Sequence, residues 1–339
     1  MTEVVKKQYN YCMDFLKGIA CIFVVFIHVK FPGDFGQAVQ AVARFAVPFF
    51  FMVSGYYCYR KDYQGVKGGG KKIWHIAKIT FFAYLFYIVV ALLENAFWGG
   101  TNQFNFSLSH IGAVLLYSVP SNVPGQLWFL IALLEVYVIY FFVDLLHARK
   151  LAYWVAAFTF LAMIVLAQGF WFHYGYKLPA DYYRNAWFEG FSFFTLGYYL
   201  HDKQNKLAVS NKVLLIIISA SVVMSVIERF LCGCIFAVHL STYPLVISLF
   251  IYAIKNGNLH QGVLQRVGKK YSMYVYILHM FWWHWFDRGA EALGLEENML
   301  VMWLRPLIVL VLVMLMSMGC YALFNRKKNI NTCKLNEVK

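Results

Sequence analysis

DFLKGIACIFVVFIH, residues 14–28, lies inside an apolar segment, residues 11–31, that is long enough to span a bilayer. The stretch nevertheless carries a carboxylate, an ammonium and an imidazole, on Asp14, Lys17 and His28. A charged side chain at membrane depth costs about 2.5–3.5 kcal/mol on insertion scales, so such residues mark functional sites by default. The segment therefore predicts both a membrane helix and a site on it.

The spacing of the three side chains places them on one helix face. At about 100° per residue, Lys17 and His28 are about 20° apart around the axis and about 16 Å apart along it. Asp14 lies on the same face. Each residue alone has a structural explanation, since Lys17 can extend to the membrane surface and His28 can cap a helix contact. The three together indicate a polar stripe that runs through the bilayer.

The composition indicates an all-α, polytopic membrane protein. Of 339 residues, 61% are hydrophobic and 14% are charged, whereas soluble domains have about 25% charged residues. Apolar runs of about twenty residues favour helices over a barrel. We expect a single membrane-embedded domain, 1–339, with about ten transmembrane helices. The expected spans are 11–31, 38–59, 73–95, 126–146, 151–168, 186–201, 211–230, 234–254, 268–286 and 302–324.

The basic residues predict the orientation. Most of the 30 Lys and Arg residues fall in alternate loops, on the side that also holds both termini. The positive-inside rule then puts both termini in the cytoplasm. We expect the chain to be integral to the cytoplasmic, or inner, membrane. Lys17 would lie in the inner half of its span and His28 in the outer half. The net charge of +14 is explained by a basic rim facing anionic lipid, so no nucleic-acid partner is needed.

The segment from Arg60 to Lys78 is the most basic of the predicted cytoplasmic segments. Its glycines and lysines resemble a phosphate-binding loop, but Lys72 replaces the Ser or Thr that would hold magnesium, and no strand precedes it. We expect instead a glycine-rich loop whose exposed N–H groups, with the start of the next helix, bind an anion. The candidate donor-binding residues are Lys71, Lys72, His75 and Lys78.

Further polar and aromatic residues are expected in the outer half of the spans. Each is more readily explained as structural, and their shared location is what suggests an acceptor site. They are Arg44, Trp128, Glu135, Arg184, Glu189 and His279. The seven cysteines show no zinc spacing, so no metal site is expected.

Several motifs resemble the acyltransferase type 3 family of integral membrane O-acyltransferases, in the branch that modifies surface polysaccharides. They are DxxKGIA with His28, RFAVPFFF at 44–51 with SG at 54–55, LWFL at 127–130, LGY at 196–198 and SxYxYILH at 272–279. The resemblance covers essentially the whole chain. Lys17 replaces the family's usual Arg. The family's Arg-x-x-Arg donor motif is represented only by Lys72-x-x-His75 or His75-x-x-Lys78.

The resemblance implies O-acetylation: transfer of an acyl group from a cytoplasmic acyl-CoA, expected to be acetyl-CoA, to a hydroxyl of an envelope glycan or lipid-linked precursor. Acyl-CoA is then a co-substrate and no bound cofactor is expected. His28 would act as general base or carry the acyl group. Lys17, paired with Asp14, would contact the donor, and Arg44 or Arg184 would stabilise charge near the acceptor.

Two other classes of protein fit the same polar stripe. A transporter or flippase for a glycan or small anion also needs intramembrane charges, although no clear internal repeat is present. A membrane sensor without chemistry is the third reading. Release of CoA from acetyl-CoA separates the enzyme from both. The homo-oligomeric state is left open.

Overall fold

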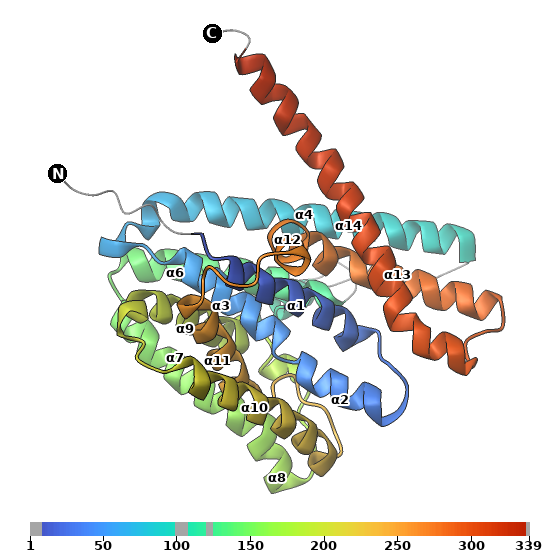
Figure 1. Cartoon of the computed structure of the whole chain (residues 1–339), viewed down its shortest axis with the longest axis horizontal. Helices are drawn as coiled ribbons and strands as arrows, with labels where there is room; N and C mark the ends of the chain where they lie inside the picture. The colour runs from blue at the N-terminus through green and yellow to red at the C-terminus, as the bar shows by residue number, and fades with distance from the viewer. Residues whose placement is uncertain (1–8, 99–107, 120–124, 337–339) are drawn as a thin grey trace. The chain divides into compact units, whose positions relative to one another are not determined.

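The computed structural model describes residues 9–98, 108–119 and 125–336, and every regular element among them is a helix (Figure 1). This confirms the all-α fold class. Seven stretches of the described residues are long and apolar enough to cross a bilayer. The expected count of ten is not confirmed. The chain forms two compact units, Met1–Ala46 with Tyr252–Lys339, and Val47–Ile251; each is described separately, and the single domain 1–339 stays a prediction.

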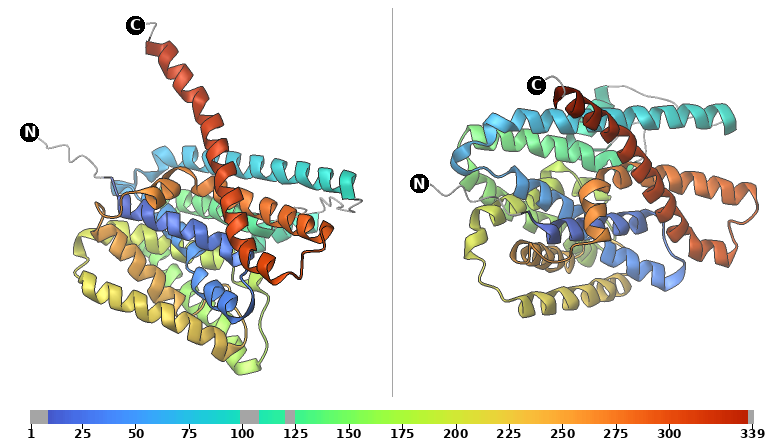
Figure 2. Two further views of the ribbon diagram at one scale, coloured as in Figure 1. Left: turned by 45° about the vertical axis from the view of Figure 1, so that its right-hand side comes forward. Right: turned by 45° about the horizontal axis from the view of Figure 1, so that its top comes forward.

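The first unit is built around α1, Tyr11–His28, whose N-terminus is capped by the side chain of Asn10. Its other helices are α2 (Gly33–Ala43), α12 (Val263–Lys270), α13 (Ser272–Ala292) and α14 (Met299–Asn336). In Figures 1 and 2, α12 lies against α1, and α13 and α14 lie side by side. Glycines set the α1–α12 distance: a Cβ at Gly18 would stand 2.1 Å from the Leu264 carbonyl oxygen, and one at Gly268 1.9 Å from that of Asp14. The short helix therefore crosses α1 beside Asp14 and Lys17.

The second unit contains most of α3 and α11 and everything between them. Its elements are α3 (Ala46–Cys58), η1 (Lys61–Tyr63), α4 (Gly65–Trp98), α5 (Leu108–Tyr117), η2 (Gly125–Leu127), α6 (Trp128–Leu145), α7 (Arg149–Ile164), η3 (Val165–Gly169), α8 (Phe170–Tyr174), η4 (Ala180–Tyr182), η5 (Ala186–Gly190), α9 (Phe191–Lys203), η6 (Gln204–Lys206), α10 (Asn211–Cys232) and α11 (Thr242–Lys255). Small residues again allow close crossings. A Cβ at Gly55 or Gly197 would collide with the backbone of the facing helix, so α3 and α9 approach at these two glycines.

One of the seven candidate stretches, Gly33–Cys58, covers the expected span 38–59, whereas the expected spans 186–201, 234–254 and 268–286 are not among the seven. Span 186–201 is divided between η5 and α9. Span 38–59 is broken into α2 and α3 at Arg44, because Pro48 has no N–H to donate to the Arg44 carbonyl four residues earlier. Span 234–254 contains only one short helix, α11. Span 268–286 is divided between α12 and α13 at Tyr271.

The glycine-rich loop expected before Lys71 is also wrong, because α4 already begins at Gly65. The helix N–H groups of Gly69 and Gly70 point along the helix to earlier carbonyls, so they are not exposed for an anion. Packing explains the helix: a Cβ at Gly69 would stand 2.9 Å from the ring of Phe141 on α6. These glycines therefore let α4 approach α6, and tertiary packing outweighs their poor helix propensity.

Candidate active site

Asp14 and Lys17 form an ion pair on α1, with 2.9 Å between Oδ1 and Nζ. The side chains are only 11% and 19% exposed. The hydroxyl of Tyr9 donates to the second carboxylate oxygen of Asp14. The intramembrane ammonium expected from the sequence is therefore neutralised one turn away, which lowers the cost of both charges.

Helix α12 adds three residues to this ion pair that sequence reasoning missed. Gln265 Nε2 lies 3.3 Å from the Tyr9 hydroxyl oxygen, and the ammonium of Lys269 lies 4.3 Å from the centre of the Tyr9 ring. Gly268 permits the contact by removing a side chain at the crossing. No local sequence pattern predicts this cluster, because 256 positions separate Gln265 from Tyr9.

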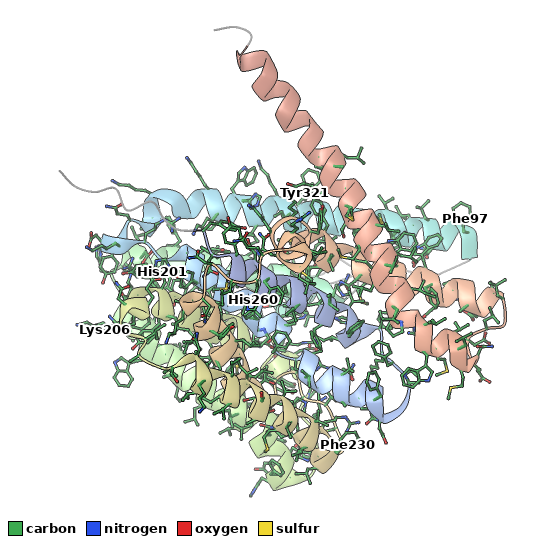
Figure 3. The ribbon with its side chains drawn as sticks, in the orientation of Figure 1. Phe97, His201, Lys206, Phe230, His260 and Tyr321 are labelled. Atoms are coloured by element: carbon green, nitrogen blue, oxygen red, sulfur yellow. The ribbon has the colours of Figure 1, made fainter. Side chains whose placement is uncertain are left out.

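His28 lies at the last turn of α1 against His279 of α13, with ring centroids 5.0 Å apart. The indole of Trp283 is 6.2 Å from the His28 ring. The structure thus brings together two of the predicted site residues, which are separated by most of the chain. Other histidines have local roles (Figure 3): His260 stacks on Phe15, and His201 contacts the Tyr56 carbonyl.

The protonated nitrogen of His279 is fixed by its own helix. Nδ1 lies 2.7 Å from the carbonyl oxygen of Tyr276, and a carbonyl can only accept, so Nδ1 carries the proton. Nε2 is then the basic nitrogen. It is fully buried and has no hydrogen-bond partner among the residues that the structure describes. A buried lone pair beside His28 can accept a hydrogen bond from that ring or from a bound hydroxyl.

Arg44, the remaining candidate of the first unit, caps the end of α2 where the chain turns into α3. It is partly buried, and its position follows from the helix break at Pro48. Sequence reasoning placed it inside one continuous span, 38–59, whereas the structure divides that span into α2 and α3 at this arginine.

The second unit brings Trp128 and Arg184 together, with the guanidinium 5.3 Å from the ring centre. Arg184 also pairs with Asp181 at 3.0 Å, a residue that sequence reasoning missed. Glu189 is 2% exposed, within η5. Arg184 and Glu189 were both predicted as acceptor-side residues, and the ion pair of Arg184 is with Asp181.

Glu135 has a separate environment on α6. Its Oε2 accepts a hydrogen bond of 2.7 Å from the Ser118 hydroxyl, and the oxygen of Ser118 accepts one of 3.0 Å from the N–H of Ala186. Ser118 therefore connects the ends of α5 and η5 to the acid of α6. The hydrogen bond from Ser118 gives Glu135 a structural role. Glu135 lies in the half of α6 that begins at Trp128.

The candidate donor residues lie near the start of α4. Lys71, His75 and Lys78 recur at helical spacing and are exposed, and Lys67 extends the same face by one turn. Lys72 lies off this face, where its ammonium donates to the Tyr57 carbonyl at 2.8 Å. We call the four exposed residues, Lys67, Lys71, His75 and Lys78, the α4 basic face.

The chain as a whole matches one known family. The model of an acyltransferase domain, acyltransferase type 3, matches residues 10–324. The chain belongs to the acyltransferase type 3 family. Comparison with curated proteins and with solved structures gave no match. The family and the apolar helices together make the chain an integral membrane acyltransferase.

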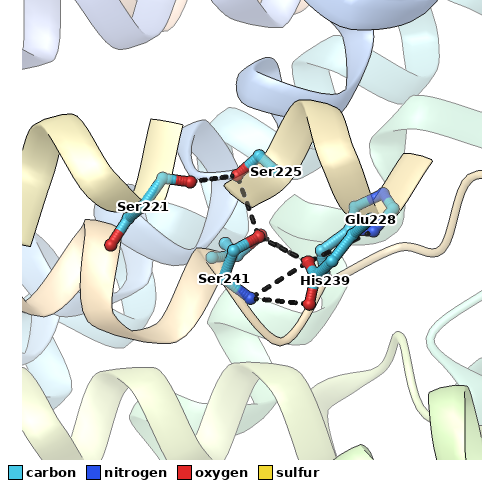
Figure 4. A network of polar contacts seen from close by, with 6 residues as sticks. Ser221, Ser225, Glu228, His239 and Ser241 are labelled. Atoms are coloured by element: carbon cyan, nitrogen blue, oxygen red, sulfur yellow. Dashed lines mark hydrogen bonds and ion pairs between the residues drawn. The ribbon is translucent and has the colours of Figure 1, made fainter. Parts of the chain in front are cut away.

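A further buried polar cluster joins α10 to the segment before α11 (Figure 4). Its residues lie within the part of the chain that matches the acyltransferase family. The carboxylate of Glu228 accepts hydrogen bonds from the N–H and the hydroxyl of Ser241. The Ser241 hydroxyl lies 2.9 Å from that of Ser225, and His239 Nδ1 lies 3.8 Å from Glu228. These contacts join two chain segments across a buried surface, so we assign the cluster to the stability of this acyltransferase and not to its chemistry.

Proposed function

We propose that this acyltransferase transfers an acyl group, expected to be acetyl, from cytoplasmic acyl-CoA to a hydroxyl of an envelope glycan or its lipid-linked precursor. It would do so in the inner membrane with both termini cytoplasmic, as the distribution of basic residues suggests. The observation that carries the proposal is the pair of imidazoles formed by partly buried His28 and fully buried His279, with ring centroids 5.0 Å apart.

His28 supplies the acid–base chemistry in this proposal. The acceptor oxygen attacks the thioester carbonyl carbon, its proton passes to neutral His28, and the carbon–sulfur bond breaks to release CoA as thiolate. His28 then returns the proton to the thiolate. A second route has His28 carry the acyl group before the hydroxyl attacks. In both routes the basic Nε2 of His279 lies next to the imidazole that changes charge.

Lys17 and the α4 basic face would serve the donor. CoA carries a pyrophosphate and a further phosphate, which suit exposed lysines on one helix face. The Lys17 ammonium is already paired with Asp14. We therefore propose that Lys17 orients the donor through one directed hydrogen bond and adds little net positive charge.

Trp128 and Arg184 would serve the acceptor. An aromatic face beside a guanidinium can hold the apolar face and the hydroxyls of a sugar, and the two side chains are in contact. Arg44 is proposed to stabilise the charge that develops on the acceptor side. Glu135 and Glu189 remain candidates for contacts with the sugar hydroxyls.

The proposal is tested with purified protein in lipid nanodiscs supplied with acetyl-CoA and an envelope glycan fraction. Free thiol is measured as CoA is released, and mass spectrometry detects acetylated glycan. We expect both signals from the wild type, neither from His28→Ala, and unchanged signals from His173→Ala, which changes an exposed histidine of α8. Equal rates in wild type and folded His28→Ala would overturn the assignment of His28. Glycan movement across the bilayer without CoA release would instead favour a transporter.

A further inference from the structure

Arg149, at the first turn of α7, links three elements of the second unit. Its Nε donates to Asp144 at the end of α6 at 2.8 Å, and its Nη2 donates at 2.8 Å to the backbone carbonyl of Arg60, which precedes η1. Arg149 and Asp144 are 8% and 3% exposed. A buried charge held in this way cannot move without leaving its partner uncompensated.

Aromatic rings enclose the same guanidinium. Its carbon lies 4.0 Å from the ring centre of Tyr63, 5.1 Å from that of Tyr59 and 5.2 Å from that of Tyr198. The Tyr198 hydroxyl also donates to Asp144 at 2.7 Å. The guanidinium thus holds the Arg60–Tyr63 turn both through a backbone hydrogen bond and through the ring of Tyr63.

The turn needs such support because its backbone is strained. Asp62 and Tyr63 have φ values of 52° and 56°, in the left-handed region that ordinary residues rarely adopt. Such conformations persist only where the surrounding structure enforces them. Arg149 contacts this turn on both sides of Asp62, at the Arg60 carbonyl and the Tyr63 ring.

The α4 helix begins directly after this turn, at Gly65, and carries the α4 basic face from Lys67 onward. The turn is also held from α4 itself, because Lys72 donates to the Tyr57 carbonyl. Arg149 and Lys72 therefore fix the two sides of the connection between α3 and α4. The direction in which α4 leaves the turn determines where its first basic residues lie.

We propose that Arg149 is a positioning residue for the donor: by holding the Arg60 carbonyl and the Tyr63 ring, it sets the α4 basic face in place for the phosphates of CoA. The inference rests on the proposed function for the choice of ligand. Arg149 itself touches no substrate in this proposal, because it is 8% exposed and its Nε and Nη2 donate to Asp144 and to the Arg60 carbonyl.

If Arg149 were purely structural, replacing it would lower stability without a specific effect on the binding of CoA. The test therefore separates a structural role from a positioning role. Arg149→Lys keeps the charge and can keep the pair with Asp144, but an ammonium lacks the planar fork that bonds Asp144 and Arg60 at once. The matched control is Arg288→Lys, which changes an exposed arginine that is paired with Glu291. Both variants are compared with the wild type at the same temperature, well below the unfolding midpoint of each.

Two measurements are made on full-length protein in nanodiscs. Calorimetry gives the Kd for CoA, and hydrogen exchange with mass spectrometry reports the peptides covering 59–70 and, as an internal reference, those of α13. For Arg149→Lys we expect the Kd for CoA to rise about tenfold, in line with the loss of one hydrogen bond to a charged group. Exchange should rise in 59–70 only. Where transfer is detected, the KM for acyl-CoA should rise by a similar factor and kcat should change less than twofold.

The outcomes decide separately on the inference and on the function. Unchanged exchange in 59–70 shows that Arg149 does not hold the turn, and raised exchange with an unchanged Kd shows that the turn does not position the donor; either result overturns the inference. Wild-type protein that binds CoA but never transfers an acyl group overturns the proposed function, while the role of Arg149 is still judged by Kd and exchange. Wild-type protein that does not bind CoA overturns both.

Discussion

His28 and His279 lie with their ring centroids 5.0 Å apart, although 250 residues of chain separate them. The Tyr276 carbonyl fixes the proton of His279 on Nδ1 and leaves Nε2 as its basic nitrogen. Two imidazoles at this distance, one with a fixed tautomer, can exchange a proton directly or through one water. The pair therefore gives the first unit two neighbouring groups that can take part in acid–base chemistry.

Replacing His28 should remove most of the activity. General-base catalysis contributes about 10²–10⁴-fold, so His28→Ala should lose about that factor in the rate of CoA release. His173→Ala, at an exposed position, should transfer at the wild-type rate. Size-exclusion chromatography and the thermal midpoint confirm that each variant is folded. A rate within threefold of the wild type for His28→Ala would exclude it as the base.

The two nitrogens of His279 predict different effects for two substitutions. His279→Asn can still donate to a backbone carbonyl but has no basic nitrogen, so the rate of CoA release should fall at least about tenfold while the thermal midpoint changes little. His279→Phe removes the carbonyl contact as well and should lower both. If the asparagine variant loses stability but keeps its rate per folded molecule, His279 is structural.

Lys17 should be replaceable by arginine and not by alanine. Arginine keeps the positive charge beside Asp14. Alanine leaves the carboxylate in a largely buried site, still bonded to the Tyr9 hydroxyl but without a counter-charge on residue 17, and should lower both expression and activity. The double variant Lys17→Ala/Asp14→Asn removes both charges. It should recover folding, measured by the thermal midpoint, but not transfer. Recovery of transfer in the double variant would show that Lys17 only neutralises Asp14.

The lysines of the α4 basic face should affect the donor more than the chemistry. Lys71→Ala/Lys78→Ala should raise the KM for acyl-CoA at least about tenfold with a smaller change in kcat, because these ammoniums are exposed and share one helix face. Lys72→Ala removes a hydrogen bond to the Tyr57 carbonyl and should also lower the thermal midpoint. Lys212→Ala, at the exposed start of α10, is the control. An unchanged KM in the first variant would exclude the α4 basic face.

Glu228 and Ser241 should matter for stability alone. Ser241→Ala leaves the partly buried carboxylate of Glu228 without its hydroxyl donor, at a cost of about 1–3 kcal/mol. The thermal midpoint in detergent should fall, whereas Ser219→Ala, which changes an exposed serine of α10, the helix that carries Glu228, should leave it unchanged. Activity per folded molecule should be the same in all three proteins. A specific loss of activity in Ser241→Ala would instead place this cluster in the reaction.

Asp202 and Tyr59 give the connection between α3 and η1 a defined pH dependence. Burial alone would raise the pKa of Asp202, but hydrogen bonds from Lys203 and from the Tyr59 hydroxyl outweigh it and lower that pKa below the usual range. Because the folded-state pKa is the lower one, the stabilisation is complete above the ordinary carboxyl pKa of about 4 and is lost as the pH falls through the folded-state pKa. Asp202→Asn should therefore lower the thermal midpoint by the same amount from pH 7 to pH 5. A difference that already disappears at pH 5 would contradict this assignment.

The sequence predicted the elements whose signal is local. Mean hydropathy and the scarcity of charge indicated a helical membrane protein, because a bilayer leaves the backbone few other ways to satisfy its hydrogen bonds. The period of the helix placed Asp14, Lys17 and His28 on one face of α1, and the ion pair between the first two follows from their separation of three residues. The order of short motifs along the chain was enough to indicate the family.

Long-range packing decided the rest. The lysines around Gly68 belong to a helix and not to a loop, because α6 accepts the glycine face of α4 at Phe141. Tyr9 and Gln265 join the Asp14–Lys17 pair only because Gly18 and Gly268 let α12 cross α1 at contact distance. Periodicity describes the faces of a single helix but does not specify which helix covers each face. The partners of Lys17, His28 and Arg149 therefore depend on side-chain packing between distant segments, which only the tertiary structure supplies.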